Sequence, residues 1–497
     1  MAAFEIPEGP RSINGGACRY NIVQMLPRTA AVSGTRPGIS GATQGLMTFD
    51  WNEDILWWLP SMSYFEIRAH MAVPTTLVSL ARTAGIAYVD CWPAALFSQI
   101  QYYVNGGSVD LLQFPPQAEA ASLYSSVDKT WLKSSGSAQG AGEALTTRIL
   151  NSSQFGTASA STSNINEIVA TWRPPVSIFS CPHCLPPGAQ HKVDFTWSPT
   201  GEINMIESLA SVTTASNVQV YIDSFYFYKA TLVPDASIPL PMRGYIELNP
   251  MQINTYQITG GTTLNQNVTI PPTTTRILVG FQDNNVANSL AAGQNGLKPI
   301  TSFAAAFSNG ATDLSAYIQN LYVNMPDLGY QFPNPQYTLT AGSATGAKTD
   351  WDRAFQDWLC YTRGLSGGFE GSVPFGAFDT GIGAAVLAYL ASTPGATFGD
   401  PNNDQQAWIA SVATTAVSLT QSNQTALWGW LGRCPGPIFA FPVVRPPDRF
   451  VSNAQLNVTL SGSATSVTCF IMSSYTKGLA VEADGSGKYR YTLVDGL

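Results

Sequence analysis

Charged side chains are scarce in this chain. Asp, Glu, Lys and Arg make up 11% of its 497 residues, whereas ordinary soluble domains contain roughly 25%. The net charge is −8, which argues against the chain as a whole being a nucleic-acid binder. A weakly charged surface is expected to be covered by neighbouring molecules, so the composition favours a protein with large interfaces.

Long apolar runs and regularly spaced cysteines are also missing. The nearest approach to a membrane span, residues 382–392, is shorter than the ~20 apolar residues that a span needs. No charged region followed by an apolar run opens the sequence, so no signal peptide is expected. Seven cysteines without regular spacing do not predict a disulfide framework. These features favour synthesis in a reducing, intracellular place.

Only three histidines are present, His70, His183 and His191, and this weakens the hydrolase motifs. Gly364-Leu-Ser-Gly-Gly368 matches a nucleophile elbow, but every histidine precedes it and a helix, rather than a strand, is expected before it. Phe378-Asp-Thr-Gly381 resembles the aspartic-protease triplet but occurs once, so a homodimer would have to supply the second carboxylate.

The remaining chemical motifs are weak as well. Carboxylates such as Glu53, Asp54 and Glu370 cannot be paired for glycosidase chemistry without a fold. Cys181-Pro-His-Cys184, with His191 seven residues later, supplies three weak candidates for a metal site, Cys181, Cys184 and His191. A structural zinc normally needs four ligands, so free thiols in a loop are the better prediction. Residues 342–348 have the wrong spacing for a phosphate loop. We therefore expect no enzyme, no cofactor and no small-molecule substrate.

The length and the 45% hydrophobic content predict two domains with large cores. Strands are expected from Leu46 onward, and residues 116–132 have helical spacing of apolar residues. Residues 134–165 are rich in Ser, Gly and Ala and predict a long loop. The first-half strands with the clearest alternation are 64–73, 97–104, 192–197 and 218–233.

The second half repeats this plan. A helix is expected at 350–363, with Thr349 as its cap and with Trp351, Phe355, Trp358 and Leu359 on one face. A long loop follows at about 376–435. The expected strands are 255–258, 276–282, 316–323, 455–460 and 466–472. Two antiparallel β-sandwiches of similar plan are the resulting prediction.

Two segments connect or precede these sandwiches. Pro239 and Pro241 exclude a central strand or a helix interior and predict a stiff, extended link between the last strand of the first β domain and the first strand of the second. Residues 1–44 are expected to be an extended arm, in which Arg11, Arg19, Arg28 and Arg36 could touch an anionic partner; a loosely ordered terminus is the alternative.

The order of these segments resembles a known family. Leu96-Phe-Ser-Gln-Ile-Gln-Tyr-Tyr-Val-Asn-Gly106, then Leu185-Pro-Pro-Gly188, then Val220-Tyr-Ile-Asp-Ser-Phe-Tyr-Phe-Tyr-Lys229 are similar to the first roll of double jelly-roll major capsid proteins. Ile270-Pro-Pro-Thr-Thr-Thr-Arg-Ile-Leu-Val-Gly-Phe-Gln282 and the strands of 453–473 fall in the order of the second roll. The nearest resemblance is to virophages, polinton-like viruses and adintoviruses, within the PRD1–adenovirus structural lineage.

The resemblance implies an all-β chain of two consecutive eight-stranded antiparallel jelly rolls, the first over 45–236 and the second over 237–497. It implies a homotrimer that forms a pseudo-hexameric capsomer, and capsomers that tile an icosahedral shell around double-stranded DNA. Neighbouring capsomers, penton and minor capsid proteins, and indirect contact with the genome or an internal membrane are the implied partners. The protein would be part of the virion, made and assembled inside the host cell. A two-domain β-sandwich carbohydrate-active enzyme and a lectin-like adhesin remain the alternatives.

Overall fold

The computed structural model describes the strands and helices of both halves and several of their connections. The described residues are 19–28, 45–72, 87–89, 91–126, 165–199, 204–207, 219–233, 242–259, 261–283, 318–339, 350–362, 438–444, 450–460 and 467–494. The long loops expected at 134–165 and 376–435 lie almost wholly outside these residues, and so does the segment with Pro239 and Pro241.

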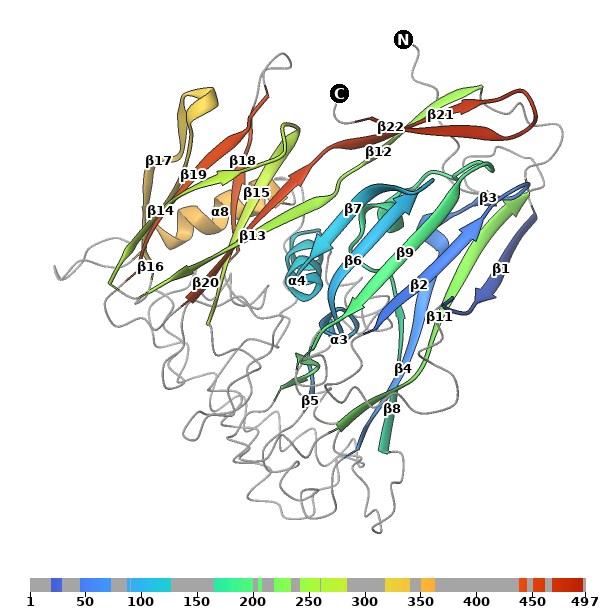
Figure 1. The fold of residues 1–497 in the computed structure, drawn as a ribbon. Coiled ribbons are helices and arrows are strands. Elements are labelled where there is room, and N and C mark those ends of the chain that lie inside the picture. Colours follow the sequence, from blue (N-terminus) through green and yellow to red (C-terminus); the bar gives the residue numbers. More distant parts are fainter. Residues whose placement is uncertain are drawn as a thin grey trace.

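The first half forms two packed antiparallel sheets, each built on four main strands, and one of them also contains a short fifth strand (Figure 1). The strand order of one sheet is β1-β11-β4-β8, and that of the other is β2-β9-β6-β7. A short strand, β3 (Trp57–Trp58), also pairs with β11, and β5 (Ala87–Tyr88) pairs with β10 (Ile206–Glu207). The main strands are β1 (Arg19–Met25), β2 (Leu46–Asn52), β4 (Tyr64–Ala72), β6 (Phe97–Val104), β7 (Gly107–Gln113), β8 (Ile165–Trp172), β9 (Gln190–Trp197) and β11 (Gln219–Val233).

The second half repeats this topology strand for strand. Its sheets have the orders β13-β20-β15-β18 and β14-β19-β16-β17, so each strand takes the place of its counterpart in the first half. The strands are β13 (Met251–Ile258), β14 (Thr263–Thr269), β15 (Thr274–Asp283), β16 (Ile318–Met325), β17 (Tyr330–Thr338), β18 (Ile438–Pro442), β19 (Asn453–Leu460) and β20 (Val467–Tyr475). Two eight-stranded jelly rolls in one chain confirm the double jelly roll that the family resemblance implied.

The helices follow the same repeat. In the first roll α4 (Pro115–Ser126) comes directly after β7, and in the second α8 (Trp351–Thr362) follows β17. Trp358 of α8 is fully buried, as its helical spacing predicted, and so is Ala120 of α4. Shorter helical segments are α3 (Trp92–Ala95), η1 (Pro60–Met62), η4 (Ser177–Ser180) and η7 (Pro326–Leu328).

Alternation of side chains produces the core between the two sheets of each roll. Along β2, Met47, Phe49 and Trp51 point inward and are buried, as the two-residue period of a strand requires. Phe49 meets Phe65 and Phe225 edge-on, at 5.2 and 5.3 Å between ring centroids. Full burial of a phenylalanine contributes about 1.5–3 kcal/mol, so this aromatic cluster anchors roll one.

The start of the first roll differs from the prediction. Residues 1–44 were expected to be an arm, yet Arg19–Met25 form β1, which pairs along its whole length with β11. The physical reason is that β11 would otherwise leave the backbone groups of Thr231 and its neighbours without a strand partner on that side. The first roll's sheet therefore begins before residue 45, and part of the expected arm belongs to it.

Candidate functional site

A two-stranded ribbon crosses from one roll to the other and defines the candidate site. Strands β12 (Arg243–Leu248) and β13 follow one another, and they run antiparallel to β21 (Lys477–Ala483) and β20. Pairing stops only at Asn249-Pro250, where Pro has no amide to donate, and the Tyr475 amide donates to the Pro250 carbonyl at 3.1 Å. The ribbon thus continues across the break, and roll two's sheet extends out of roll two.

The far end of the ribbon is a third sheet, β12-β21-β22, which contains β22 (Tyr489–Val494). Figure 1 shows this sheet reaching over the ends of roll-one strands. Ile246, Leu479 and Val481 are buried on one face of it. The second roll is predicted to start at residue 237, but β12 belongs to this third sheet, and β13 is the first strand of the second roll.

Tyr489 docks the third sheet onto roll one. Its amide donates to the Pro187 carbonyl at 2.9 Å, and its ring meets Trp57 edge-on at 5.8 Å. Gly188 has φ +118°, and a Cβ placed there would lie 2.4 Å from the Tyr489 carbonyl oxygen. No flexible side chain could give way, because the opposing atoms are backbone. Glycine at this position is therefore what allows β22 to approach so closely.

Tyr491 and Lys488 extend the contact. The Tyr491 hydroxyl donates to the Pro186 carbonyl at 2.5 Å, and its ring meets His191 edge-on at 6.1 Å. Lys488 Nζ lies 2.7 Å from Asp54 Oδ1 in an exposed ion pair. Burial raises the pKa of Tyr491 well above its ordinary value, so the hydroxyl remains a hydrogen-bond donor. We call residues 477–494, with these contacts, the strap.

A second contact between the rolls lies at β7 and α4. Phe114, just before α4, meets Phe470 of β20 edge-on at 5.6 Å. Gln117 Nε2 donates to Gln282 Oε1 at 3.1 Å, and both amides are buried. Lys477 Nζ also donates to the Ser108 carbonyl at 3.2 Å. Strap and helix hold the rolls at separate places, and two separated attachments fix an orientation better than a single hinge.

A buried ion pair supports the loop under the strap. Lys229 of β11 pairs with Glu53, and both side chains are almost fully buried. Burial raises the pKa of Glu53, while the hydrogen bond and charge of Lys229 oppose that rise. The Glu53 carbonyl accepts the Gly188 amide at 2.7 Å, so this pair stabilises the turn on which Tyr489 rests. Glu53 pairs with Lys229 and Asp54 with Lys488, so the charge of each carboxylate is compensated within the chain.

The three metal candidates do not converge on a site. Across the described residues, no three His, Cys, Asp or Glu side chains gather in a way that could hold a metal ion. His191 is buried between Trp51 and Trp58, and its Nδ1 lies 2.8 Å from the Tyr102 hydroxyl. Cys181 and Cys184 are buried, and burial raises the pKa of Cys181 to about 11. His191 is a packing residue of roll one.

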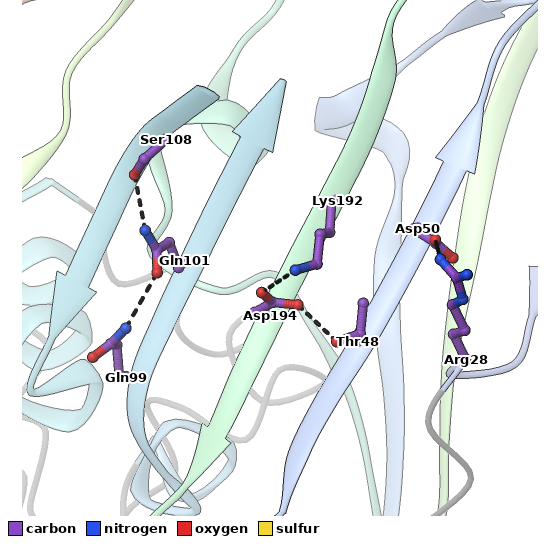
Figure 2. A network of polar contacts seen from close by, with 8 residues as sticks. All are labelled: Arg28, Thr48, Asp50, Gln99, Gln101, Ser108, Lys192 and Asp194. Atoms are coloured by element: carbon purple, nitrogen blue, oxygen red, sulfur yellow. Dashed lines mark hydrogen bonds and ion pairs between the residues drawn. The ribbon is translucent and has the colours of Figure 1, made fainter. Parts of the chain in front are cut away.

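The arginines of the expected arm are separated. Arg28 pairs with Asp50 of β2 on the outer face of the β2-β9-β6-β7 sheet (Figure 2), so its charge is compensated within the chain. Arg19 opens β1, and Arg11 and Arg36 lie outside the described residues. The motifs at 364–368, 378–381 and 342–348, together with Glu370, also lie outside them. Within the described part of the chain, no helix has the length and apolarity needed to cross a membrane.

Sequence reasoning missed the strap and its partners. The contacts join residues 186–188 to residues 489–491, and the Tyr491–Pro186 pair is 305 residues apart in sequence. The only local signal was Pro186-Pro187-Gly188, a turn composition that says nothing about what approaches it.

Comparisons with known proteins identify the fold. Searches against protein-family models and against curated proteins each find no match. A chain in the cryo-EM structure of the Sputnik virophage is 11% identical, with a TM-score of 0.52 over 98% of this chain and 90% of that one. The mavirus major capsid protein is 11% identical, with a TM-score of 0.48 over 99% and 92%. The faustovirus major capsid protein is 8% identical, with a TM-score of 0.45 over 93% and 90%.

The similarity to the Sputnik chain spans both rolls, so it covers the whole architecture rather than one sandwich. It agrees with the strand orders, which are the same in each half. The chain has the double jelly-roll fold.

Proposed function

We propose that this chain is a major capsid protein of an icosahedral double-stranded DNA virus and a component of the virion. The observation that carries the proposal is the pair of rolls with identical strand order, held at a fixed relation by the ribbon and the strap. One chain then presents two similar sides, and a ring of three chains presents six. Such a ring can occupy hexagonal positions through repeated heterologous contacts.

Finer points belong to the same proposal. We propose a homotrimeric, pseudo-hexameric capsomer that contacts neighbouring capsomers and, at special positions, penton and minor capsid proteins. We divide the chain between β11 and β12, near residue 236, and place the first roll before that point. Pro239 and Pro241 remain candidates for a stiff link there. Arg11 and Arg36 remain candidates for contact with an anionic partner inside the shell, such as the genome or a membrane.

Low overall charge supports the proposal, because tiling buries much of each subunit's side surface and charged groups are costly to bury. The strap supports it further, since a lattice requires every subunit to present the same angle between its rolls.

Light scattering and negative-stain imaging of the purified protein test the proposal. We expect trimers with a six-sided outline at micromolar concentration, and closed shells or sheets at higher concentration. Monodisperse monomers under all these conditions would contradict a capsid role.

A further inference from the structure

The outer face of one roll-two sheet carries only uncharged polar side chains at its centre. In the sheet β14-β19-β16-β17, residues such as Leu321, Val323, Leu456 and Val458 are buried inside the roll. The residues between them in sequence therefore point outward. These outward residues form rows across the strands, fixed by the antiparallel register.

One row consists entirely of amides. Asn267 lies opposite Gln455, Gln455 opposite Asn324, and Asn324 opposite Gln331. Asn324 Nδ2 donates to Gln455 Oε1 at 3.3 Å. Asn267 is exposed and the other three are partly exposed, so the row presents amide donors and acceptors to the surroundings.

The neighbouring rows have the same character. Asn265, Asn457 and Tyr322 form one row, in which Asn265 is exposed, Tyr322 is partly exposed and Asn457 is buried between them. In another row the Thr263 hydroxyl lies 3.1 Å from that of Thr459. Asn320 and Thr338 continue this last row. None of these residues has an acidic or basic side chain. We call these three rows the neutral face.

The equivalent sheet of roll one shows that the fold itself does not demand neutrality. Its outer face, drawn in Figure 2, carries the Arg28–Asp50 pair and the Lys192–Asp194 pair, the latter at 2.6 Å. Charged groups meet this roll-two sheet at its margins: Asp327 accepts the Ser452 amide at 2.8 Å, and Asp350 accepts the amide of Thr338, on the edge strand β17, at 2.8 Å. A neutral centre with charge at the rim is the pattern of protein–protein interfaces, whose cores are depleted of charged residues.

We propose that the neutral face is the surface on which a second copy of this chain docks. This proposal rests on the capsid function and names a place for its self-association. Amides and hydroxyls both donate and accept hydrogen bonds, so the face is complementary to another uncharged polar surface, and a chain with 11% charged residues offers such a surface. Nucleic acid or anionic lipid would require cations, which the rows lack.

The size of the face is consistent with the centre of an interface. Four strands about 4.8 Å apart and about seven residues long, at about 3.3 Å per residue, span roughly 19 by 23 Å. That flat area of roughly 440 Å² is about half of the ~800 Å² that each partner buries in a standard interface. The surrounding loops and rim charges would supply the rest.

Charge placed on the face tests the proposal. The variant N265D/N267D/N324D changes each amide to a carboxylate of the same shape, and the control N265T/N267T/N324T keeps the face uncharged. Each variant is first checked for an unchanged circular dichroism spectrum and melting temperature. Unpaired carboxylates are costly to bury, so we expect the concentration of half-dissociation to rise at least about 100-fold for the Asp variant and less than about 5-fold for the Thr variant. Light scattering over a dilution series measures both.

The outcomes separate this inference from the proposed function. Assembly of the Asp variant at parental concentrations would overturn the neutral face as a docking surface while leaving the capsid role intact. A parent protein that remains monomeric would overturn the capsid role itself. If the Asp variant assembles normally but loses binding to immobilised oligosaccharides that the parent binds, the face is a glycan site and the proposal is wrong.

Discussion

Substitution of Gly188 by alanine probes the strap directly. The added Cβ would lie 2.4 Å from the carbonyl oxygen and 2.7 Å from the amide nitrogen of Tyr489, so β22 must move or detach. The docking that is at risk comprises two hydrogen bonds, to the Pro187 and Pro186 carbonyls, at about 1 kcal/mol each. It also includes the burial of the rings of Tyr489 and Tyr491, at about 2 kcal/mol each.

Loss of half of this roughly 6 kcal/mol would raise local opening about 100-fold. The assay is hydrogen exchange of the backbone amides of residues 489–494, read with the circular dichroism spectrum as a check that both rolls stay folded. The Tyr489 amide is the most direct reporter because it donates to Pro187. We expect its protection to fall about 100-fold in G188A.

Gly487 provides a matched control. It also has a positive φ, +87°, but a Cβ there would meet nothing within 4 Å. G487A therefore carries only the backbone strain of about 1–2 kcal/mol, and we expect its effect on exchange at Tyr489 to be about 30-fold at most. Equal protection of Tyr489 in G188A and in the parent would refute the argument that this close approach holds the strap.

Three further predictions concern roll one. K229M leaves the Glu53 carboxylate buried without its partner and should lower the free energy of unfolding by about 3–5 kcal/mol. K229M/E53L removes both charges and should lower the free energy of unfolding by less. Urea denaturation compares the two variants, and equal losses would contradict the pairing argument. Burial lowers the pKa of His191 from 6.5 to about 3, so between these pH values the unfolded state binds a proton that the folded state does not, and stability falls as the pH drops from about 6.5 toward 3. H191Q should flatten this dependence of stability on pH, measured by denaturation at several pH values. An unchanged slope would assign the dependence to other groups. Deletion of residues 1–28 removes β1 and should expose the edge of β11 and cause aggregation. Deletion of residues 1–18 removes no described strand and should leave the melting temperature unchanged. Similar solubility of the two truncated proteins would contradict the role of β1.

The sequence predicted strands whose alternation is strong. Phe97–Val104, Gln190–Trp197 and Gln219–Val233 alternate large apolar and polar residues, and all three are found as β6, β9 and β11. Thr263–Thr269 escaped notice because its outward positions are Thr and Asn and its inward positions include Gln266, so its contrast between faces is weak. The repeat of strands, helix, long loop and strands was readable because both halves carry it.

The remaining features could not be predicted from the sequence, because they depend on pairing between residues that are far apart in the chain. Nothing near Arg243 reveals that it lies opposite Glu482, because strand pairing depends on partners that are remote in the chain. Arg19–Met25 was taken for an arm because its arginine and its Gly-rich flank outweighed the short apolar pair Ile22-Val23. The strap could not be inferred for the same reason, since Tyr489 and Tyr491 become informative only beside Pro186, Pro187 and Gly188.

The strap also bears on the order in which the two rolls and the contact between them form during synthesis. Roll one is complete in sequence at β11, and roll two at β20, but β22 leaves the ribosome after both. Domains generally fold as units during synthesis, so each roll can form its core before the contact that sets their mutual orientation exists. A chain that stops before residue 489 keeps the strands of both rolls and lacks the contact with Pro186 and Pro187. Synthesis of β22 thus becomes a condition for the correct angle between the rolls, and chains that stop before residue 489 would lack the contact that sets this angle.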